Sequence, residues 1–265
     1  YQKMILTRNK EDIRLFLNGN LQFSSIDEYR YHESLVHIPF SMSLKRDSVL
    51  ILGGGDGLVV REVLKYPDIK TVTLVDIDPE ITHLAKTHAQ LKHLNQNSLA
   101  DPRVTIHHLD AMRFLAENKA TYDQIILDLP DPNNVSLARL YSQEFYRLVK
   151  QRLNKTGIMT TQATSPFFAK QTFWCIVNTL KSAGFQTVKP FHINVPSFGE
   201  WGFILATNSR ILPSNLTVPT RYLDPEIIDQ AFYFSKDLQS DNQEASYLDD
   251  PNVLGFYLNE WKYWN

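Results

Sequence analysis

The 265-residue sequence contains a single cysteine, Cys175, so an internal disulfide is impossible and a reducing compartment is the simpler expectation. Cys175 lies in the apolar stretch 172–177, which favours a buried thiol over a reactive one. No apolar run approaches the ~18 residues needed to span a bilayer, and no signal peptide is recognisable. The net charge of −2 gives no general attraction to nucleic acid or anionic lipid. These absences predict a cytoplasmic protein without a nucleic-acid partner.

Metal-ligand spacing is also missing, although the chain has eight histidines. His83, His88 and His93 recur every fifth residue, which places them about 140° apart around a helix. His107 and His108 are adjacent and would point to opposite faces of a strand. None of these patterns lets several side chains converge on one ion, so we expect no metal site.

The first 45 residues have the pattern of β-structure. Apolar residues alternate on both sides of Asn18-Gly19, which is a strong signal for a hairpin turn. Residues 4–6 would supply a third strand. We therefore predict a small N-terminal β-domain over residues 1–45.

From residue 46, strand-like and helix-like stretches alternate, which is typical of a mostly parallel sheet covered by helices. Apolar residues three or four apart indicate helices over 81–88 and 141–152. This pattern predicts an α/β domain over residues 46–208. The seven predicted strands are 49–52, 71–75, 104–107, 124–127, 157–161, 186–191 and 201–207.

Residues 209–265 form a third part that is polar and aromatic, without clear strands. Residues 225–232 are a candidate helix. Trp261 and Trp264 near the end of the chain are expected to pack back on the α/β domain rather than to bind a partner.

A glycine-rich loop follows the first strand of the α/β domain. A dinucleotide fingerprint G-x-G-x-x-G would need glycine at Leu58, and Gly53, Gly55 and Gly57 give G-x-G-x-G instead. This spacing favours the close backbone approach of a nucleoside of the S-adenosylmethionine type. The alternative is a tight turn between strand and helix.

Acidic residues follow three further strands. Asp76 is placed to accept both hydroxyls of a ribose. Asp110 would accept from an adenine amino group or, as likely from spacing alone, cap the next helix, as Asp78 is expected to do with Pro79. Asp128 directly follows the strand 124–127. Ligands bind at the carboxyl ends of strands in open α/β sheets, so this acidic edge predicts a cationic ligand.

Taken in order, these motifs resemble the polyamine aminopropyltransferases, most closely the spermidine synthases. The resemblance covers residues 1–208. It rests on residues 1–2, 17–22, 27–33, the glycine loop with Asp56, residues 76–78, Asp110-Ala111, residues 128–132, Gln162 and residues 195–203.

The resemblance implies a small N-terminal β-domain before a methyltransferase-like Rossmann domain with a mostly parallel seven-stranded sheet. It implies transfer of an aminopropyl group from decarboxylated S-adenosylmethionine, as co-substrate, to a diamine, commonly putrescine. The products would be spermidine and methylthioadenosine, and no prosthetic group is expected. The family usually forms dimers, so a homodimer is expected. Some bacterial relatives carry a membrane-spanning region ahead of this part, which would fit the start at Tyr1.

The resemblance also assigns roles to residues. Asp128 would accept the proton, with Asp131 and Tyr31 beside it. The donor nucleoside would contact Gln2, Gly53, Gly55, Asp56, Asp76, Asp110 and Ala111. The acceptor amine would contact Gln22, His32, Asp56, Asp128, Leu129, Pro130, Asp131, Gln162 and Phe198. The alternative for Asp128 is a loop cap, and for Tyr31 and His32 it is simple packing.

Three departures from the family pattern concern the site. Asp76 stands where the family more often has Glu, and Phe198 stands where a Tyr is common, which removes a hydroxyl near the acceptor. Residues 133–135 replace a frequent Gly-Pro. They leave the identity of the acceptor open.

The proposed reaction needs a base, and the acidic residues of the site can supply one. The sulfonium donor leaves as a neutral thioether, but an alkylammonium acceptor with a pKa of ~10.4 costs about 4–5 kcal/mol to deprotonate at pH 7. A carboxylate such as Asp128 can accept that proton as the bond forms. Two other functions stay open: an S-adenosylmethionine methyltransferase, whose substrate carboxylate Asp56 would repel, and a non-catalytic polyamine-binding protein.

Overall fold

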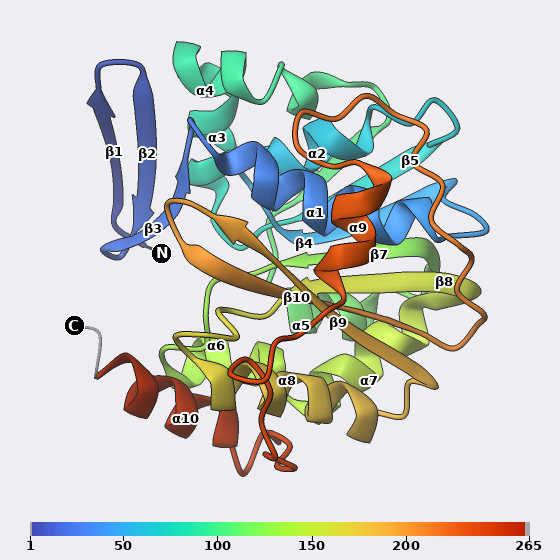
Figure 1. Ribbon diagram of the computed structural model, residues 1–265. Coiled ribbons are helices and arrows are strands. Elements are labelled where there is room, and N and C mark those ends of the chain that lie inside the picture. Colours follow the sequence, from blue (N-terminus) through green and yellow to red (C-terminus); the bar gives the residue numbers. More distant parts are fainter. Residues whose placement is uncertain (1, 263–265) are drawn as a thin grey trace.

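The computed structural model describes residues 2–262, which form two sheets and the helices around them (Figure 1). The small sheet contains β1 (Met4–Asn9), β2 (Asp12–Leu17) and β3 (Asn20–Ser24). The large sheet contains β4 (Ser48–Gly53), β5 (Thr71–Val75), β6 (Val104–His107), β7 (Tyr122–Asp128), β8 (Leu153–Gln162), β9 (Thr187–Val195) and β10 (Gly199–Thr207). The α/β class and all seven predicted strands of the large sheet are thereby confirmed.

Helices connect and cover these strands. They are α1 (Glu28–Ser41), α2 (Leu58–Val63), α3 (Pro79–Thr87), α4 (Ala89–Leu94), α5 (Ala111–Glu117), α6 (Val135–Ala138), α7 (Gln143–Arg152), α8 (Lys170–Ser182), α9 (Pro225–Ala231) and α10 (Asn252–Trp261), with short 3-10 turns η1 (Ser98–Ala100) and η2 (Arg139–Tyr141). Among residues 2–262, no helix is long and apolar enough to cross a bilayer.

The N-terminal strands form the predicted antiparallel hairpin with a third strand. Asn18 and Gly19 both have positive φ, 51° and 88°, as a two-residue hairpin turn between β2 and β3 requires. The prediction of β-structure as far as residue 45 is wrong beyond Ser24, because α1 follows. This helix is buried on nearly all sides, so its sequence lacks the one-sided apolar pattern of a surface helix. The division of the chain at residues 45 and 208 stays a prediction.

The large sheet has the strand order β6-β5-β4-β7-β8-β10-β9. The strands from β4 to β8 pair in parallel, whereas β10 runs antiparallel to both β8 and β9. The chain order reverses at β4, which lies between β5 and β7, and this is the point at which open α/β sheets bind ligands. Gly53 and Asp128 are direct register partners there, so the glycine loop and the acidic loop emerge side by side.

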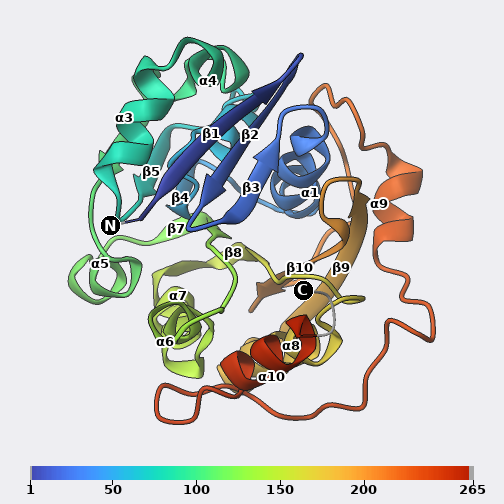
Figure 2. The same ribbon diagram turned by 90° about the vertical axis from the view of Figure 1, so that its left-hand side faces the viewer.

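Two apolar cores lie on opposite faces of the large sheet (Figure 2). Helices α1, α2, α3 and α9 contribute to one core, and α5, α7, α8 and α10 contribute to the other. Cys175 is fully buried in the second core, and burial raises the pKa of its thiol to about 12, so the predicted inert thiol is confirmed.

The C-terminal part follows β10, packs against β9 as α9 and then packs against α8 as α10 (Figures 1 and 2). The helix predicted over 225–232 is confirmed by α9. Trp261 packs against Phe168 with ring centroids 6.2 Å apart, as expected for a segment that folds back. Trp264 lies outside the described residues.

Candidate active site

Glycine allows the loop after β4 to approach the acid at the end of β7. A Cβ at Gly53, where φ is +82°, would lie 2.0 Å from the carbonyl oxygen of Asp128. A Cβ at Gly54 would lie 3.1 Å from Asp128 Oδ2, and one at Gly55 would lie 2.6 Å from Asp76 Oδ2. These three consecutive glycines therefore let the backbone approach two acidic residues at once.

Asp76 is half-buried at the end of β5 and holds the glycine loop. Its carboxylate accepts hydrogen bonds from the backbone N–H of Gly55 at 3.0 Å and of Asp78 at 2.9 Å. Burial nevertheless raises its pKa above the ordinary range. Asp78 caps α3 by accepting from Glu80 N at 3.0 Å, with Pro79 in the first turn, as the sequence predicts.

Asp110 caps helix α5, which is the alternative that its spacing left open. One carboxylate oxygen accepts from Arg113 N at 3.0 Å, and the other accepts from the guanidinium of Arg139. Ala111, the first residue of α5, is buried beside it. A ligand that used Asp110 would have to share or displace the Arg139 contact.

Asp128 is half-buried and is held by Tyr31 of α1. The Tyr31 hydroxyl donates to Asp128 Oδ1 at 2.6 Å. Burial raises the pKa of Asp128, while the charge of His32 and the bond from Tyr31 act in the opposite direction. Burial and the neighbouring Asp128 raise the pKa of Tyr31 well above its ordinary value, so Tyr31 remains a donor. Its ring also contacts Phe198, with centroids 6.1 Å apart.

His32 is buried beside Asp128 and is paired with the carboxylate of Glu28. Burial disfavours its charged form, but the carboxylate of Glu28, 2.7 Å from His32 Nδ1, raises the pKa of the imidazole overall. Glu28 is itself paired with Arg61 through two contacts of 2.8 and 2.9 Å. Burial raises the pKa of the Asp56 carboxyl to about 6, and the nearby His32 acts in the opposite direction. Arg61 and Glu28 were not predicted as site residues, although the charges of Arg61 and Glu62 interrupt an apolar run of α2.

Asp131 lies in a second cluster that fixes the loop after β7. Its carboxylate accepts from Gln162 at 3.1 Å, from Tyr257 at 3.1 Å and from Thr164 at 3.3 Å. Burial raises its pKa to about 6. Gln162 also donates to the carbonyl oxygen of Leu129 at 2.7 Å, which ties β8 to the loop.

Pro130 belongs to the same loop, and its carbonyl oxygen accepts from Tyr141 at 3.0 Å. Leu129 is buried in the core beneath it. Tyr141, Thr164 and Tyr257 were missed by the sequence reasoning. No local signal marks them, because each meets Asp131 or its loop through the fold rather than through a motif.

The structure thus brings several predicted site residues to one edge of the sheet. The connected set comprises Tyr31, His32, Gly53, Gly55, Asp56, Asp76, Asp128, Asp131, Gln162 and Phe198. Burial raises the pKa of four carboxyls in it, which means that negative charge there is poorly compensated. Such a site favours a ligand with positive charge.

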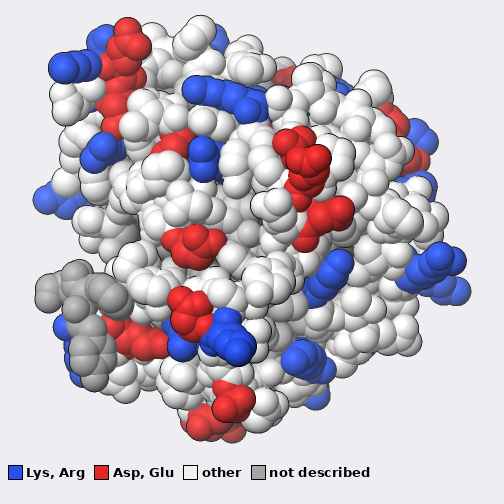
Figure 3. Space-filling view, in the orientation of Figure 1, with Lys and Arg blue, Asp and Glu red and all other residues white. Residues whose placement is uncertain are grey.

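Gln2 and Gln22 are not joined to this set by the contacts described. Gln22 lies on β3, and its side-chain amide donates to the carbonyl oxygen of Asn20 at 3.1 Å. Gln2 is half-buried two residues before β1. Their proposed contacts with the ligands stay predictions. On the face shown in Figure 3, charges of both signs are scattered among uncharged residues.

Comparison with known proteins identifies the family. The model of the spermine/spermidine synthase domain matches residues 28–215. The chain belongs to this family. It is 46% identical to polyamine aminopropyltransferase 2 of Ralstonia nicotianae over 98% of this chain and 52% of that protein. It is also 46% identical to polyamine aminopropyltransferase 1 of Streptomyces coelicolor, over 99% of this chain and 50% of that protein. The chain therefore spans about half the length of the curated relatives it matches.

Two solved structures show the same fold as this spermine/spermidine synthase domain. One is a spermidine synthase in complex with the transition-state analogue AdoDATO, with a TM-score of 0.83, 23% identity, and coverage of 96% of this chain and 85% of that chain. The other is the spermidine synthase of Thermotoga maritima, with a TM-score of 0.79, 22% identity, and coverage of 96% and 84%. The predicted family and the methyltransferase-like fold are both confirmed.

Proposed function

We propose that the chain transfers the aminopropyl group of decarboxylated S-adenosylmethionine to a diamine, with putrescine as the expected acceptor and spermidine and methylthioadenosine as products. The observation that carries this proposal is the half-buried Asp128, held by Tyr31 at 2.6 Å beside the glycine loop. Membership of the spermine/spermidine synthase family supports the same reaction class.

The transfer step needs a base but no acid. The amine nitrogen attacks the aminopropyl carbon bonded to the sulfonium sulfur, and the carbon–sulfur bond breaks. The electron pair of that bond stays on sulfur, which leaves as a neutral thioether. The attacking nitrogen loses its proton to Asp128, whose raised pKa makes it a better match for this task than an exposed carboxylate.

The other acids would bind the two substrates as cations. Asp131 would hold the distal ammonium of the diamine by a charge-assisted hydrogen bond. Asp56 would face the primary ammonium of the donor, and Asp76 would receive the ribose hydroxyls. In-line alignment of the two substrates would supply a further share of the rate. We also propose that the protein acts as a homodimer, which light scattering in solution would test.

The donor preference tests this function against that of a methyltransferase. S-adenosylmethionine carries a carboxylate that the decarboxylated donor lacks, and Asp56 would repel it. We expect the decarboxylated donor to bind at least about tenfold tighter, or roughly 1.4 kcal/mol. Calorimetric titration of both compounds measures this difference. Equal affinities, or tighter binding of S-adenosylmethionine, would reject the aminopropyl assignment.

A further inference from the structure

The hydroxyl of Tyr257 contacts the proposed amine site, although Tyr257 lies outside the residues that the family model matches. Helix α10 begins at Asn252, well beyond residue 215, where the family model ends. Its Tyr257 donates to Asp131 Oδ2 at 3.1 Å, although the two residues are 126 positions apart in the sequence. We propose that Tyr257 is a positioning residue for the Asp131 carboxylate and that α10 is thereby part of the acceptor-amine site. This inference rests on the function proposed above and extends it to the C-terminal segment.

Three residues on one stripe of α10 hold it in place. Val253, Tyr257 and Glu260 are four and three residues apart and so share a face of the helix. Val253 is fully buried in the core under the sheet. Glu260 accepts from the backbone N–H of Gln171 at 2.6 Å and of Thr172 at 3.1 Å, and also from the Thr172 hydroxyl at 2.7 Å. At one end of this face Val253 is buried in the core, and at the other end the carboxylate of Glu260 caps the N-terminus of α8. Tyr257 lies between them.

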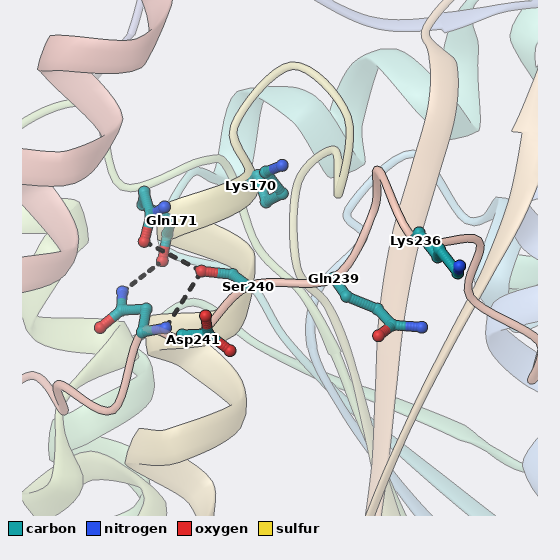
Figure 4. Close-up of a pocket in the computed structure, with 7 residues that line it drawn as sticks. Lys170, Gln171, Lys236, Gln239, Ser240 and Asp241 are labelled. Atoms are coloured by element: carbon teal, nitrogen blue, oxygen red, sulfur yellow. Dashed lines mark hydrogen bonds between the residues drawn. The ribbon is translucent and has the colours of Figure 1, made fainter.

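The segment that leads into α10 is also bound to α8. Trp174 Nε1 donates to the carbonyl oxygen of Leu238 at 2.8 Å, and Asn178 Nδ2 donates to that of Asn242 at 2.7 Å. Figure 4 shows Gln171 linked to the same segment through Ser240. A surface cavity of about 430 Å³ lies there, and none of its lining residues belongs to the acidic site. These bonds fix the path of the chain, so the position of Tyr257 is built into the fold.

The hydroxyl of Tyr257 has a defined electrostatic role. Burial raises the pKa of Asp131 to about 6, and the bonds from Gln162, Tyr257 and Thr164 oppose this rise. Burial and the neighbouring Asp131 raise the pKa of Tyr257 itself, so its hydroxyl stays protonated and can only donate to the carboxylate. All three donors are neutral, and they orient the carboxylate without cancelling its charge. A diamine ammonium therefore meets an ionised, fixed acceptor.

The test compares Tyr257→Phe with Tyr233→Phe, a matched control whose side chain is 74% exposed. Steady-state rates with putrescine are measured between about pH 5.5 and pH 8. Loss of a hydrogen bond to a carboxylate predicts an apparent KM for putrescine about tenfold higher in Tyr257→Phe, with little change in kcat or in donor affinity. The decrease of kcat/KM at low pH should begin at a higher pH in Tyr257→Phe, because Asp131 loses a hydrogen bond that favours its ionised form. Tyr233→Phe should match the wild type.

Calorimetric titration of putrescine into each variant separates this inference from the proposed function, because binding needs no turnover. If the wild type binds putrescine without forming product, and Tyr257→Phe binds it more weakly, the function fails and the role of Tyr257 stands. If Tyr257→Phe matches the wild type in its affinity for putrescine, its KM and the pH dependence of its kcat/KM, the role of Tyr257 is overturned. If the wild type binds no diamine, both are overturned. Thermal denaturation verifies that the variants are folded.

Discussion

Asp128→Asn is the substitution that most sharply separates a catalytic base from a structural cap. Asparagine keeps the size of the side chain and an oxygen that can accept from Tyr31, which lies 2.6 Å away. It removes the negative charge of the carboxylate and, with it, the capacity to accept a proton. The donor contacts proposed for Gly55 and Asp76 do not involve the altered group, so donor affinity should hardly change.

The expected loss of kcat in Asp128→Asn follows from the free energy needed to deprotonate the acceptor amine. An alkylammonium with a pKa of ~10.4 costs about 4–5 kcal/mol to deprotonate at pH 7. General-base catalysis is usually worth about 10²–10⁴ in rate, or roughly 3–5 kcal/mol at 1.36 kcal/mol per tenfold. The two estimates overlap, and we expect kcat to fall by about 10³.

The assay is methylthioadenosine release at saturating concentrations of both substrates. Below the pKa of the amine, the fraction of free amine rises about tenfold per pH unit, so the variant should regain rate as pH rises from about 7 to 9. The wild type should gain far less. Asp131→Asn provides the contrast, because it should act mainly on the KM for the diamine. Near-native turnover of Asp128→Asn at pH 7 would show that Asp128 is a structural cap.

Two further predictions concern stability. Gly53→Ala should lower the free energy of unfolding by at least about 2 kcal/mol, since the new Cβ would lie 2.0 Å from a carbonyl oxygen at a φ of +82°. Gly255→Ala in α10 has open space and should be neutral or stabilising by up to about 1 kcal/mol; equal urea midpoints for the two variants would contradict this. Because burial raises the pKa of Asp131 from 3.8 to about 6, the unfolded chain ionises first and wild-type stability falls as pH rises through that window. Asp131→Asn should not show this loss, so its free energy of unfolding should rise by about 3 kcal/mol relative to that of the wild type between pH 4 and 7. A difference in unfolding free energy that stays constant across this range would refute the raised pKa of Asp131.

The sequence predicts the large sheet well because its strands alternate with helices and are apolar on both faces. The carboxyl ends of parallel strands meet at one edge, so strand-end acids such as Asp76 and Asp128 can be grouped from order alone. Helix α1 escaped prediction because burial on nearly all sides leaves no one-sided apolar pattern. The role of Asp110 could not be decided from spacing, and the structure shows it capping α5.

Contacts between distant parts of the chain are the features that sequence patterns do not record. Tyr31 meets Asp128 across 97 residues, and only the family resemblance pointed to that pair. Tyr257 lies beyond the resembling region, and its contact with Asp131 follows from the packing of α10 on α8. Glu28 and Arg61 form their ion pair because α1 packs against α2.

The central claim is aminopropyl transfer to a diamine, and product analysis tests it most directly. The purified chain is mixed with decarboxylated S-adenosylmethionine and a panel of amines, and the products are identified by mass spectrometry. We predict methylthioadenosine and an aminopropylated diamine in equal amounts, with putrescine converted to spermidine. Bound amine without any product, or methylated products from S-adenosylmethionine, would contradict the account.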